Sequence, residues 1–280
     1  MIYDARRCEL GEGPLWHPTR GQLFWFDILN KKLLSRLGDT ALEWQFDQMV
    51  SAAGWVSDNE LLIASETQLL LFNLDTSTQR HIAPLEADNK ITRSNDGRAD
   101  PQGGFWIGTM GKSAEKGAGA IYRFYRGELR RLYSDITISN AICFAPDGRA
   151  AYFTDTVTAR VMRVGLDNEG WPHGAPQVYL DLPTNPDGAV IDAAGNMWLA
   201  EWGSSRVGCY DPSGQMIGKA TFDAPNTSCP AFGGADLTTL YCTTAQQHMD
   251  AATRAAHPHS GKVFAAVGAG KGQAEHRVIL

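Results

Sequence analysis

A sixfold repeat is the feature of this sequence that most restricts its fold. The repeating unit runs from a small or turn residue through an apolar strand, an Asp/Gly turn, an aromatic strand, a polar turn and a further apolar strand. Its copies follow one another at about 41 to 47 residues, beginning at Glu12, Ala53, Asn95, Asn140, Asp187 and Phe232. Because a four-stranded propeller blade takes about 40 to 50 residues, the repeat predicts an all-β, six-bladed β-propeller with a central channel.

Competing all-β folds do not account for this repeat. A β-sandwich or a pair of barrels would supply the strands but not the sixfold self-similarity. No linker or shift in composition divides the chain, and radial closure requires all six blades, so we expect residues 1–280 to form one domain. We expect the strand that closes the ring to come from residues 2–8 or from residues 276–280.

The overall composition restricts the partners and the setting of the protein. The 280 residues carry a formal net charge of -6 without a block of Lys or Arg, which disfavours nucleic acid and acidic membrane surfaces. No apolar run is long enough to span a membrane, and no leader pattern begins the chain. Five cysteines without a CxxC pair are typical of reduced thiols. We therefore expect a cytoplasmic protein, monomeric or weakly homo-oligomeric, whose partner is a small molecule.

Polar residues occupy most of the predicted blade starts. Each blade begins its innermost strand near one mouth of the channel, so residues at equivalent starts converge on the axis. Ordinary packing would make these positions small and apolar, yet four of the six carry a carboxylate or an amide: Glu12, Asn95, Asn140 and Asp187. Asp147-Gly148 differs, because it lies between two apolar strands where a hairpin turn is required. Asp187 precedes the first strand of its blade, so we expect it to point into the channel mouth.

Three of these side chains predict a cation site. Carboxylates a few ångströms apart raise one another's pKa, and a bound cation removes this conflict between Glu12 and Asp187. Together with Asn140 they offer only hard oxygen donors, which suit Ca²⁺, Mg²⁺ or Mn²⁺ better than a closed structural zinc site. We expect one divalent cation, Ca²⁺, Mg²⁺, Mn²⁺ or Zn²⁺, with coordination positions left open to water or substrate.

Six short motifs connect the sequence to a known family. They are GEGPLW from Gly11, RSNDG from Arg93, GTM from Gly108, SNAICFAPDG around Asn140, NPDG around Asp187 and SCPAFGG from Ser228. Each motif alone is weak, but in this order they cover essentially the whole chain. The sequence resembles the senescence marker protein/gluconolactonase/luciferin-regenerating family. This resemblance implies a six-bladed propeller that hydrolyses sugar lactones with one divalent cation.

The resemblance also implies roles for individual residues. Glu12, Asn140 and Asp187 look like the family's metal ligands, while Arg93 and Asn95 look like the residues that hold the hydroxyl groups of the substrate. Asp187 would either act as the general base or orient a metal-bound water, and the sequence leaves both roles open.

One loop departs from the family pattern. Some relatives have a substrate-contacting glutamate three residues after the GTM motif, where this chain has Ser113. The nearest carboxylate here is Glu115, which we therefore take as the candidate substrate contact. Lys112 or Lys116 could bring positive charge to the mouth, although a solvated loop is the simpler interpretation. Among the tryptophans, Trp202 is the one we expect to line the mouth.

Two other functions stay open at this point. One is metal-dependent hydrolysis of phosphate esters or other esters, and the other is a non-catalytic propeller that binds calcium or another ligand. The RSNDG and NPDG motifs favour the sugar-lactone function. His248, His257 and His259 cluster loosely in the last long connection, and we interpret them as a surface loop or a short helix rather than a second metal site.

Overall fold

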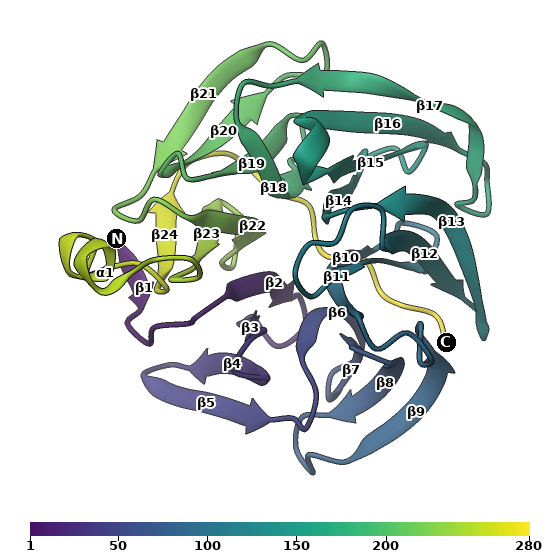
Figure 1. Cartoon of the computed structure of the whole chain (residues 1–280), viewed down its shortest axis with the longest axis horizontal. Coiled ribbons are helices and arrows are strands. Elements are labelled where there is room, and N and C mark those ends of the chain that lie inside the picture. The colour runs from purple at the N-terminus through teal and green to yellow at the C-terminus, as the bar shows by residue number, and fades with distance from the viewer.

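The computed structural model describes all 280 residues, and 24 β-strands dominate it. The strands form six four-stranded sheets arranged radially around a central axis (Figure 1). In five of the sheets the strands follow chain order, and neighbouring strands pair antiparallel. The predicted all-β fold with six propeller blades is confirmed.

The blades are numbered here in chain order, with the innermost strand first in blades 1 to 5. Blade 1 has β2 (Gly11–His17), β3 (Gln22–Asp27), β4 (Lys32–Leu37) and β5 (Thr40–Gln45), and blade 2 has β6 (Val50–Ser57), β7 (Glu60–Ser65), β8 (Gln68–Asn73) and β9 (Gln79–Pro84). Blade 3 has β10 (Thr92–Ala99), β11 (Phe105–Gly111), β12 (Gly119–Tyr125) and β13 (Glu128–Ile136). Blade 4 has β14 (Ser139–Phe144), β15 (Ala150–Asp155), β16 (Arg160–Leu166) and β17 (Pro172–Asp181). Blade 5 has β18 (Asn185–Ile191), β19 (Met197–Trp202), β20 (Arg206–Tyr210) and β21 (Met216–Thr221).

Blade 6 is built from both ends of the chain, which closes the ring. It combines β22 (Thr227–Gly233), β23 (Thr239–Thr244) and β24 (Val263–Val267) with β1 (Ile2–Asp4), which pairs with β24 as the outermost strand. Of the two predicted closures, residues 2–8 therefore supply the strand. Residues 276–280 form no strand; they belong to a C-terminal segment that crosses the centre of the ring (Figure 1), where Val278 N donates to Trp55 O at 2.9 Å.

Helical structure is limited to two short elements. These are the 3-10 helix η1 (Thr156–Thr158) and the α-helix α1 (Ala251–Ala256), which lies beside blade 6 (Figure 1). Asp250 caps α1 by accepting a hydrogen bond from Thr253 N. Neither helix is long and apolar enough to cross a membrane.

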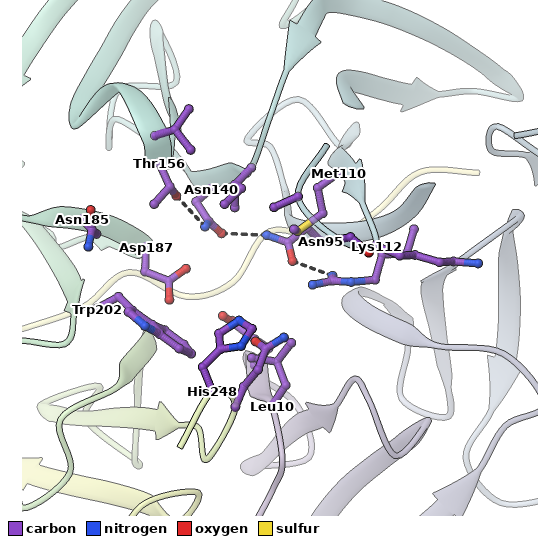
Figure 2. Close-up of a pocket in the computed structure, with 17 residues that line it drawn as sticks. Leu10, Asn95, Met110, Lys112, Asn140, Thr156, Asn185, Asp187, Trp202 and His248 are labelled. Atoms are coloured by element: carbon purple, nitrogen blue, oxygen red, sulfur yellow. Dashed lines mark hydrogen bonds between the residues drawn. The ribbon is translucent and has the colours of Figure 1, made fainter. Parts of the chain in front are cut away.

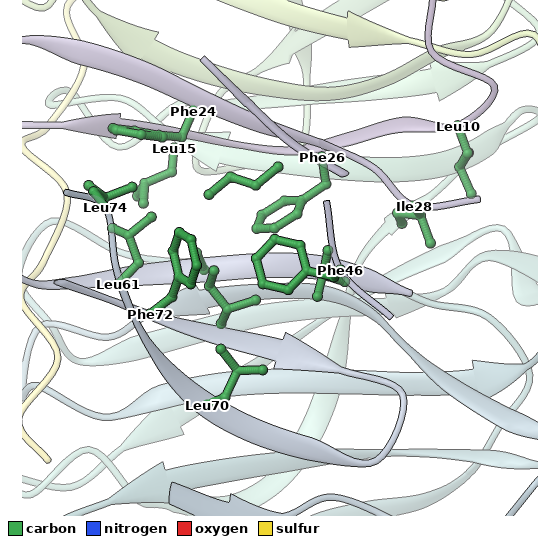
Figure 3. Close-up of a cluster of buried hydrophobic side chains, with 14 of the residues drawn as sticks. Leu10, Leu15, Phe24, Phe26, Ile28, Phe46, Leu61, Leu70, Phe72 and Leu74 are labelled. Atoms are coloured by element: carbon green, nitrogen blue, oxygen red, sulfur yellow. The ribbon is translucent and has the colours of Figure 1, made fainter. Parts of the chain in front are cut away.

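Apolar side chains from neighbouring blades pack into shared clusters. The largest cluster contains 15 buried residues, including Phe24 and Phe26 of blade 1 and Leu61 and Phe72 of blade 2 (Figure 3). Each buried aromatic or branched side chain of this kind stabilises the fold by about 1.5 to 3 kcal/mol relative to an exposed one. Because each blade buries its apolar face against the next, the ring and the position of the innermost strands depend on all six blades.

Every innermost strand contains a register irregularity near its beginning. The pairing shifts between Glu12 and Leu15, Val50 and Ala52, Ser94 and Gly97, Asn140 and Cys143, Pro186 and Ala189, and Thr227 and Cys229. A β-bulge redirects side chains that would otherwise alternate regularly between the two faces of the strand. The shared bulge therefore marks the equivalent positions of the six blades.

The predicted blade starts at Ala53 and Phe232 are wrong by this criterion. Both residues lie beyond the bulge and pack in hydrophobic clusters between blades. The bulges of β6 and β22 instead hold Ser51 and Ser228, whose hydroxyls donate to Ser94 Oγ at 2.8 Å and to Gly11 O at 2.5 Å. The apolar pattern used to align the repeat carries no signal for the extra residue of a bulge, which explains the error.

Removal of the Tyr3 ring should weaken ring closure. This ring packs edge-on against Tyr241, with 4.8 Å between the centroids, and against Trp25 at 6.4 Å. We expect Tyr3→Ala to lower the free energy of unfolding by about 2 kcal/mol, measured by urea denaturation. Ile217→Ala on β21, where the side chain is 55% exposed, is the control and should change it by less than ~0.5 kcal/mol. Equal losses in the two variants would contradict this role of β1.

Candidate functional site

A cavity of about 610 Å³ opens where the innermost strands begin (Figure 2). At the other end of these strands, Arg98 of β10 forms an ion pair with the buried Glu275 of the C-terminal segment, and the Arg98 side chain is only 11% exposed. The C-terminal segment therefore lies across the end of the channel opposite the cavity. Among the residues that line the cavity are five of the six predicted to contact the cation or the substrate: Glu12, Arg93, Asn95, Asn140 and Asp187.

Three blades bring the predicted cation ligands together. Glu12 comes from β2, Asn140 from β14 and Asp187 from β18, at or next to the bulges that redirect these strands. Their exposed fractions are only 6%, 3% and 5%, although all three line the cavity. The expected convergence of these side chains at one channel mouth is thus present in the structure.

Burial and mutual repulsion disfavour the charged forms of both carboxyl groups. Burial, followed by the charge of Asp96, raises the pKa of Glu12 to about 8. Burial, followed by the charges of Glu12 and Asp96, raises the pKa of Asp187 well above its usual range. The nearby Arg93 guanidinium lowers both pKa values, but not enough to offset the increase. Two buried carboxylates with so little compensating positive charge form a favourable environment for a cation.

The chemistry of the donor set fits a hard divalent cation. No side chain donates a hydrogen bond to Glu12 or Asp187; the donor to Glu12 Oε2 is its neighbour Gly13 N at 3.1 Å. The protein contains no group of three or more His, Cys, Asp or Glu side chains that could hold a metal ion. A cation at this mouth would therefore depend on the amide oxygen of Asn140 as the third protein donor, and all three donors would be oxygens.

Asn140 is held by a chain of hydrogen bonds that crosses three blades. Asn95 Nδ2 of blade 3 donates to Asn140 Oδ1 at 3.0 Å, and Asn140 Nδ2 donates to Thr156 Oγ1 at 2.9 Å (Figure 2). Thr156 Oγ1 in turn donates to Pro186 O of blade 5 at 2.8 Å. Because an amide oxygen has two lone pairs, Oδ1 of Asn140 retains one for a further partner. This relay of hydrogen bonds thus fixes the orientation of the Asn140 amide and leaves one lone pair of its oxygen free.

Arg93 presents unused hydrogen-bond donors at the cavity. Its Nη1 donates to Ser94 O at 2.8 Å and to Asn95 Oδ1 at 2.7 Å, while Nε and Nη2 have no acceptor in the protein. Burial lowers the pKa of Arg93 to about 10, although the charges of Glu12 and Asp187 act in the opposite direction. A fixed guanidinium with free donors can bind the oxygen atoms of a ligand.

Asp96 helps to position the strands that carry the site, although the sequence pattern did not single it out. Its carboxylate accepts hydrogen bonds from Ile142 N at 2.7 Å and from Gly97 N at 2.9 Å. These bonds tie the bulge of β10 to the bulge that carries Asn140. Burial raises the pKa of Asp96 to about 6, while its backbone donors and Arg98 lower it. Its position between Asn95 and Gly97 in the RSNDG motif could have identified Asp96 as part of the site.

The structure does not bring Glu115 to the cavity. Its side chain is exposed, and its carboxylate accepts a hydrogen bond from Ser113 N at 3.1 Å within its own loop. Lys112 and Ser113 line the cavity instead, whereas Lys116 does not. Lys112 Nζ forms an ion pair with Glu66 at 2.9 Å. Glu115 is therefore not placed as a substrate contact, because the loop turns its carboxylate back onto its own backbone.

Other cavity residues lie outside the blade-start positions that the repeat aligned. Thr156 follows β15, Asn185 begins β18, and Gln247 and His248 follow β23. The prediction that Trp202 lines the mouth is confirmed. The three histidines do not act together, because only His248 lines this cavity. His257 ends helix α1, and His259 lies 3.7 Å from Asp223.

Comparison with known proteins places this propeller in a family. The family model described as SMP-30/gluconolactonase/LRE-like region matches residues 10–246. The chain belongs to the SMP-30/gluconolactonase/LRE-like family. The resemblance inferred from the six sequence motifs is therefore confirmed.

Three relatives illustrate this SMP-30/gluconolactonase/LRE-like membership. A Rhizobium meliloti protein, provisionally named a sugar lactone lactonase, is 45% identical over 263 residues, covering 91% of this chain and 89% of its own. The L-arabinolactonase of Azospirillum brasilense is 31% identical over 275 residues, which cover 95% of this chain and 90% of the relative. The crystal structure of the calcium-binding protein regucalcin from Agrobacterium tumefaciens matches with a TM-score of 0.97 and 40% sequence identity. The match covers 100% of this chain and 97% of the regucalcin chain.

In this SMP-30/gluconolactonase/LRE-like protein, the buried carboxylates should make stability depend on pH. The pKa of Glu12 is about 8 in the folded protein against an ordinary 4.5. The folded state then binds more protons than the unfolded state between these values, so the free energy of unfolding falls as pH rises. Asp187 acts in the same direction. We expect the melting temperature of chelator-treated protein to decrease from about pH 5 to about pH 8 in differential scanning calorimetry.

Glu12→Gln supplies the control for this pH dependence. The amide occupies nearly the same volume but does not titrate, so the decrease over the same pH interval should become smaller. An identical decrease in the variant and the native protein would contradict the assignment of the pH dependence to the carboxylates at the mouth.

Proposed function

We propose that this protein is a divalent-cation-dependent hydrolase that opens sugar lactones, of the aldonolactone class, to the corresponding sugar acids. The observation that carries the proposal is the convergence of Glu12, Asn140 and Asp187 beside the free donors of Arg93 in one cavity. The arrangement combines hard oxygen donors for a cation with a cationic group for substrate oxygens. Such a combination suits the hydrolysis of an ester bond in a polar, uncharged substrate.

The names of the relatives support lactone hydrolysis as the reaction. The first two relatives above carry lactonase names at 45% and 31% identity, and each aligns with about nine-tenths of this chain. The regucalcin structure, named as a calcium-binding protein, supports a divalent cation. Fold alone would not decide the chemistry, since propellers serve many functions. The agreement between these names and the residues in the cavity favours a sugar lactone as substrate.

In the proposed site, Glu12, Asn140 and Asp187 hold the cation. When bound, the cation supplies Lewis acidity that stabilises negative charge developing on the carbonyl oxygen. Arg93 Nε and Nη2, together with Asn95, bind hydroxyl groups of the substrate and fix which face of the carbonyl is open to attack. The relay from Asn95 through Asn140 to Thr156 keeps these groups in one geometry.

Asp187 is the proposed acceptor of the proton from the attacking water. No side chain of the protein hydrogen-bonds to its carboxylate, so a carboxylate oxygen is available for this proton. Water adds its oxygen to the carbonyl carbon, and the bond from that carbon to the ring oxygen then breaks. The ring oxygen takes up the proton that Asp187 had accepted and leaves as a hydroxyl group, and the carboxylic acid formed at the carbonyl carbon releases its proton to solvent as it becomes the carboxylate of the sugar acid.

Two alternatives predict different measurements on the same site. A metal-dependent esterase acting on phosphate or other esters would turn over those substrates but not sugar lactones. A calcium-binding propeller without catalysis, suggested by the name of the regucalcin structure, would bind the cation and leave lactone hydrolysis at its spontaneous rate. A panel of lactones and esters, assayed with and without added cation, separates the three functions.

Asp187→Asn should abolish most of the turnover. The amide cannot accept the proton and is a weaker ligand, so we expect kcat for a sugar lactone to fall at least ~100-fold. The measurement is proton release in weak buffer after subtraction of the spontaneous rate, with chelator-treated protein resupplied with Ca²⁺, Mg²⁺, Mn²⁺ or Zn²⁺. Glu115→Gln is the matched control, because Glu115 lies outside the cavity, and it should retain nearly full activity. Full activity of Asp187→Asn would overturn the proposed mechanism.

A further inference from the structure

The cavity is larger than a single aldonolactone requires. Its volume is about 610 Å³. At about 30 Å³ for one water-sized group, this corresponds to roughly twenty such groups. A lactone of six carbons has about 12 non-hydrogen atoms, and a lactone that carries one further sugar unit has about 23. Glu12, Asn140 and Asp187 are nearly fully buried, so the additional space lies toward the mouth.

The indole ring of Trp202 forms part of the wall of this additional space near the mouth, which we call the outer region. Trp202 ends β19 and lies directly across from Asn185 in the ladder between β18 and β19. The indole is half-buried and packs against the cluster that contains Leu10 and Ala245, while its Nε1 has no acceptor in the protein. Figure 2 shows Trp202 on the side of the cavity next to Asp187. An aromatic ring with one apolar face and a free donor is suited to a sugar ring.

Three polar side chains line the same cavity as the indole. Asn185, Gln247 and His248 all line the cavity, and their side chains make no hydrogen bonds within the protein. The loop that carries Gln247 and His248 is nevertheless fixed, because Gln246 N and Gln247 N both donate to Glu9 O, at 3.0 and 2.8 Å. His248 is held in the left-handed backbone region, with φ 64°. Their donors and acceptors face the cavity from a fixed backbone and are free to bind a ligand there.

The charge of the outer region selects among possible ligands. The ammonium group of Lys112 is already paired with Glu66 at 2.9 Å, and the guanidinium of Arg93 lies deep in the cavity. The outer region therefore presents amide, imidazole and indole groups and no unpaired carboxylate or ammonium. A neutral, hydroxyl-rich group matches these donors and acceptors better than a phosphate or sulfonate would.

We propose that the outer region, formed by Trp202, Asn185, Gln247 and His248, is a second sugar-binding subsite. The substrate class is then aldonolactones that carry an uncharged glycosyl substituent, such as the lactones formed by oxidation of disaccharides. The lactone ring occupies the part of the cavity near Asp187, and the second sugar stacks on the indole. This assignment rests on the proposed function, because it names the substrate of the same site.

The test compares disaccharide lactones with a monosaccharide lactone on the full-length, cation-loaded protein. Glucono-1,5-lactone, cellobionolactone and maltobionolactone are assayed by proton release, each corrected for its spontaneous hydrolysis. We expect kcat/KM for at least one disaccharide lactone to exceed that for gluconolactone about tenfold or more. Trp202→Ala should reduce this ratio to about 1. Trp171→Ala, which removes a half-buried indole outside the cavity, is the matched control and should leave the ratio unchanged.

Several outcomes distinguish failure of the subsite proposal from failure of the proposed function. Good turnover of gluconolactone with no preference for either disaccharide lactone would overturn the subsite and leave the lactonase proposal intact. Equal loss of all substrates in Trp202→Ala would assign the indole a structural role; Asn185→Ala, at an exposed position, repeats the test if the first variant does not fold.

A binding measurement covers the case in which no lactone is hydrolysed. Calorimetric titration with the stable products should then show cellobionate or maltobionate binding at least about tenfold more tightly than gluconate. This preference would support the sugar subsite even though the lactonase proposal had failed. Equal or weaker binding of the disaccharide acids would overturn the subsite.

Discussion

The repulsion between two buried carboxylates, Glu12 and Asp187, is the constraint on which the organisation of this protein depends. The two groups come from blades 1 and 5, and the pKa of each is raised by burial and by neighbouring charge. Such an arrangement costs free energy unless a positive charge lies between the groups, and it persists only if the surrounding structure holds both strands in place. The inter-blade clusters and the pairing of β1 with β24 provide that support. The stability of the ring and the chemistry of the channel mouth are therefore linked.

Precise positioning comes from a small number of polar contacts between blades. Asp96 ties the bulge of blade 3 to that of blade 4. The relay from Asn95 through Asn140 and Thr156 then reaches the backbone of blade 5. Because these bonds join different blades, the positions of the donors at the mouth depend on more than one blade. The β-bulges provide the remaining element, since they turn short polar side chains toward the axis where regular pleating would alternate them.

The sequence predicted the parts of this structure that depend on local pattern and repetition. The sixfold repeat was sufficient for the propeller, and polar residues at blade starts identified Glu12, Asn140 and Asp187 as neighbours. Ala53 and Phe232 were misplaced because a bulge leaves no trace in an apolar pattern. Glu115 was chosen by proximity in sequence, whereas the conformation of its loop decides where the carboxylate points. His248 could not be found by repetition, because it lies in the connection after β23, which has no counterpart in the repeat, whereas Asn185 begins the NPDG motif and was passed over because only Asp187 was aligned as a blade start. The single domain, cytoplasmic location and oligomeric state stay predictions.

The central claim is that Glu12, Asn140 and Asp187 together hold one divalent cation. Isothermal titration calorimetry of chelator-treated protein with Ca²⁺, Mg²⁺, Mn²⁺ and Zn²⁺ tests it most directly, with Asp187→Asn titrated under the same conditions. The account predicts binding of one ion per chain for at least one of these metals, with the affinity reduced at least ~100-fold in the variant. Absence of binding for all four metals, or unchanged affinity in Asp187→Asn, would contradict it.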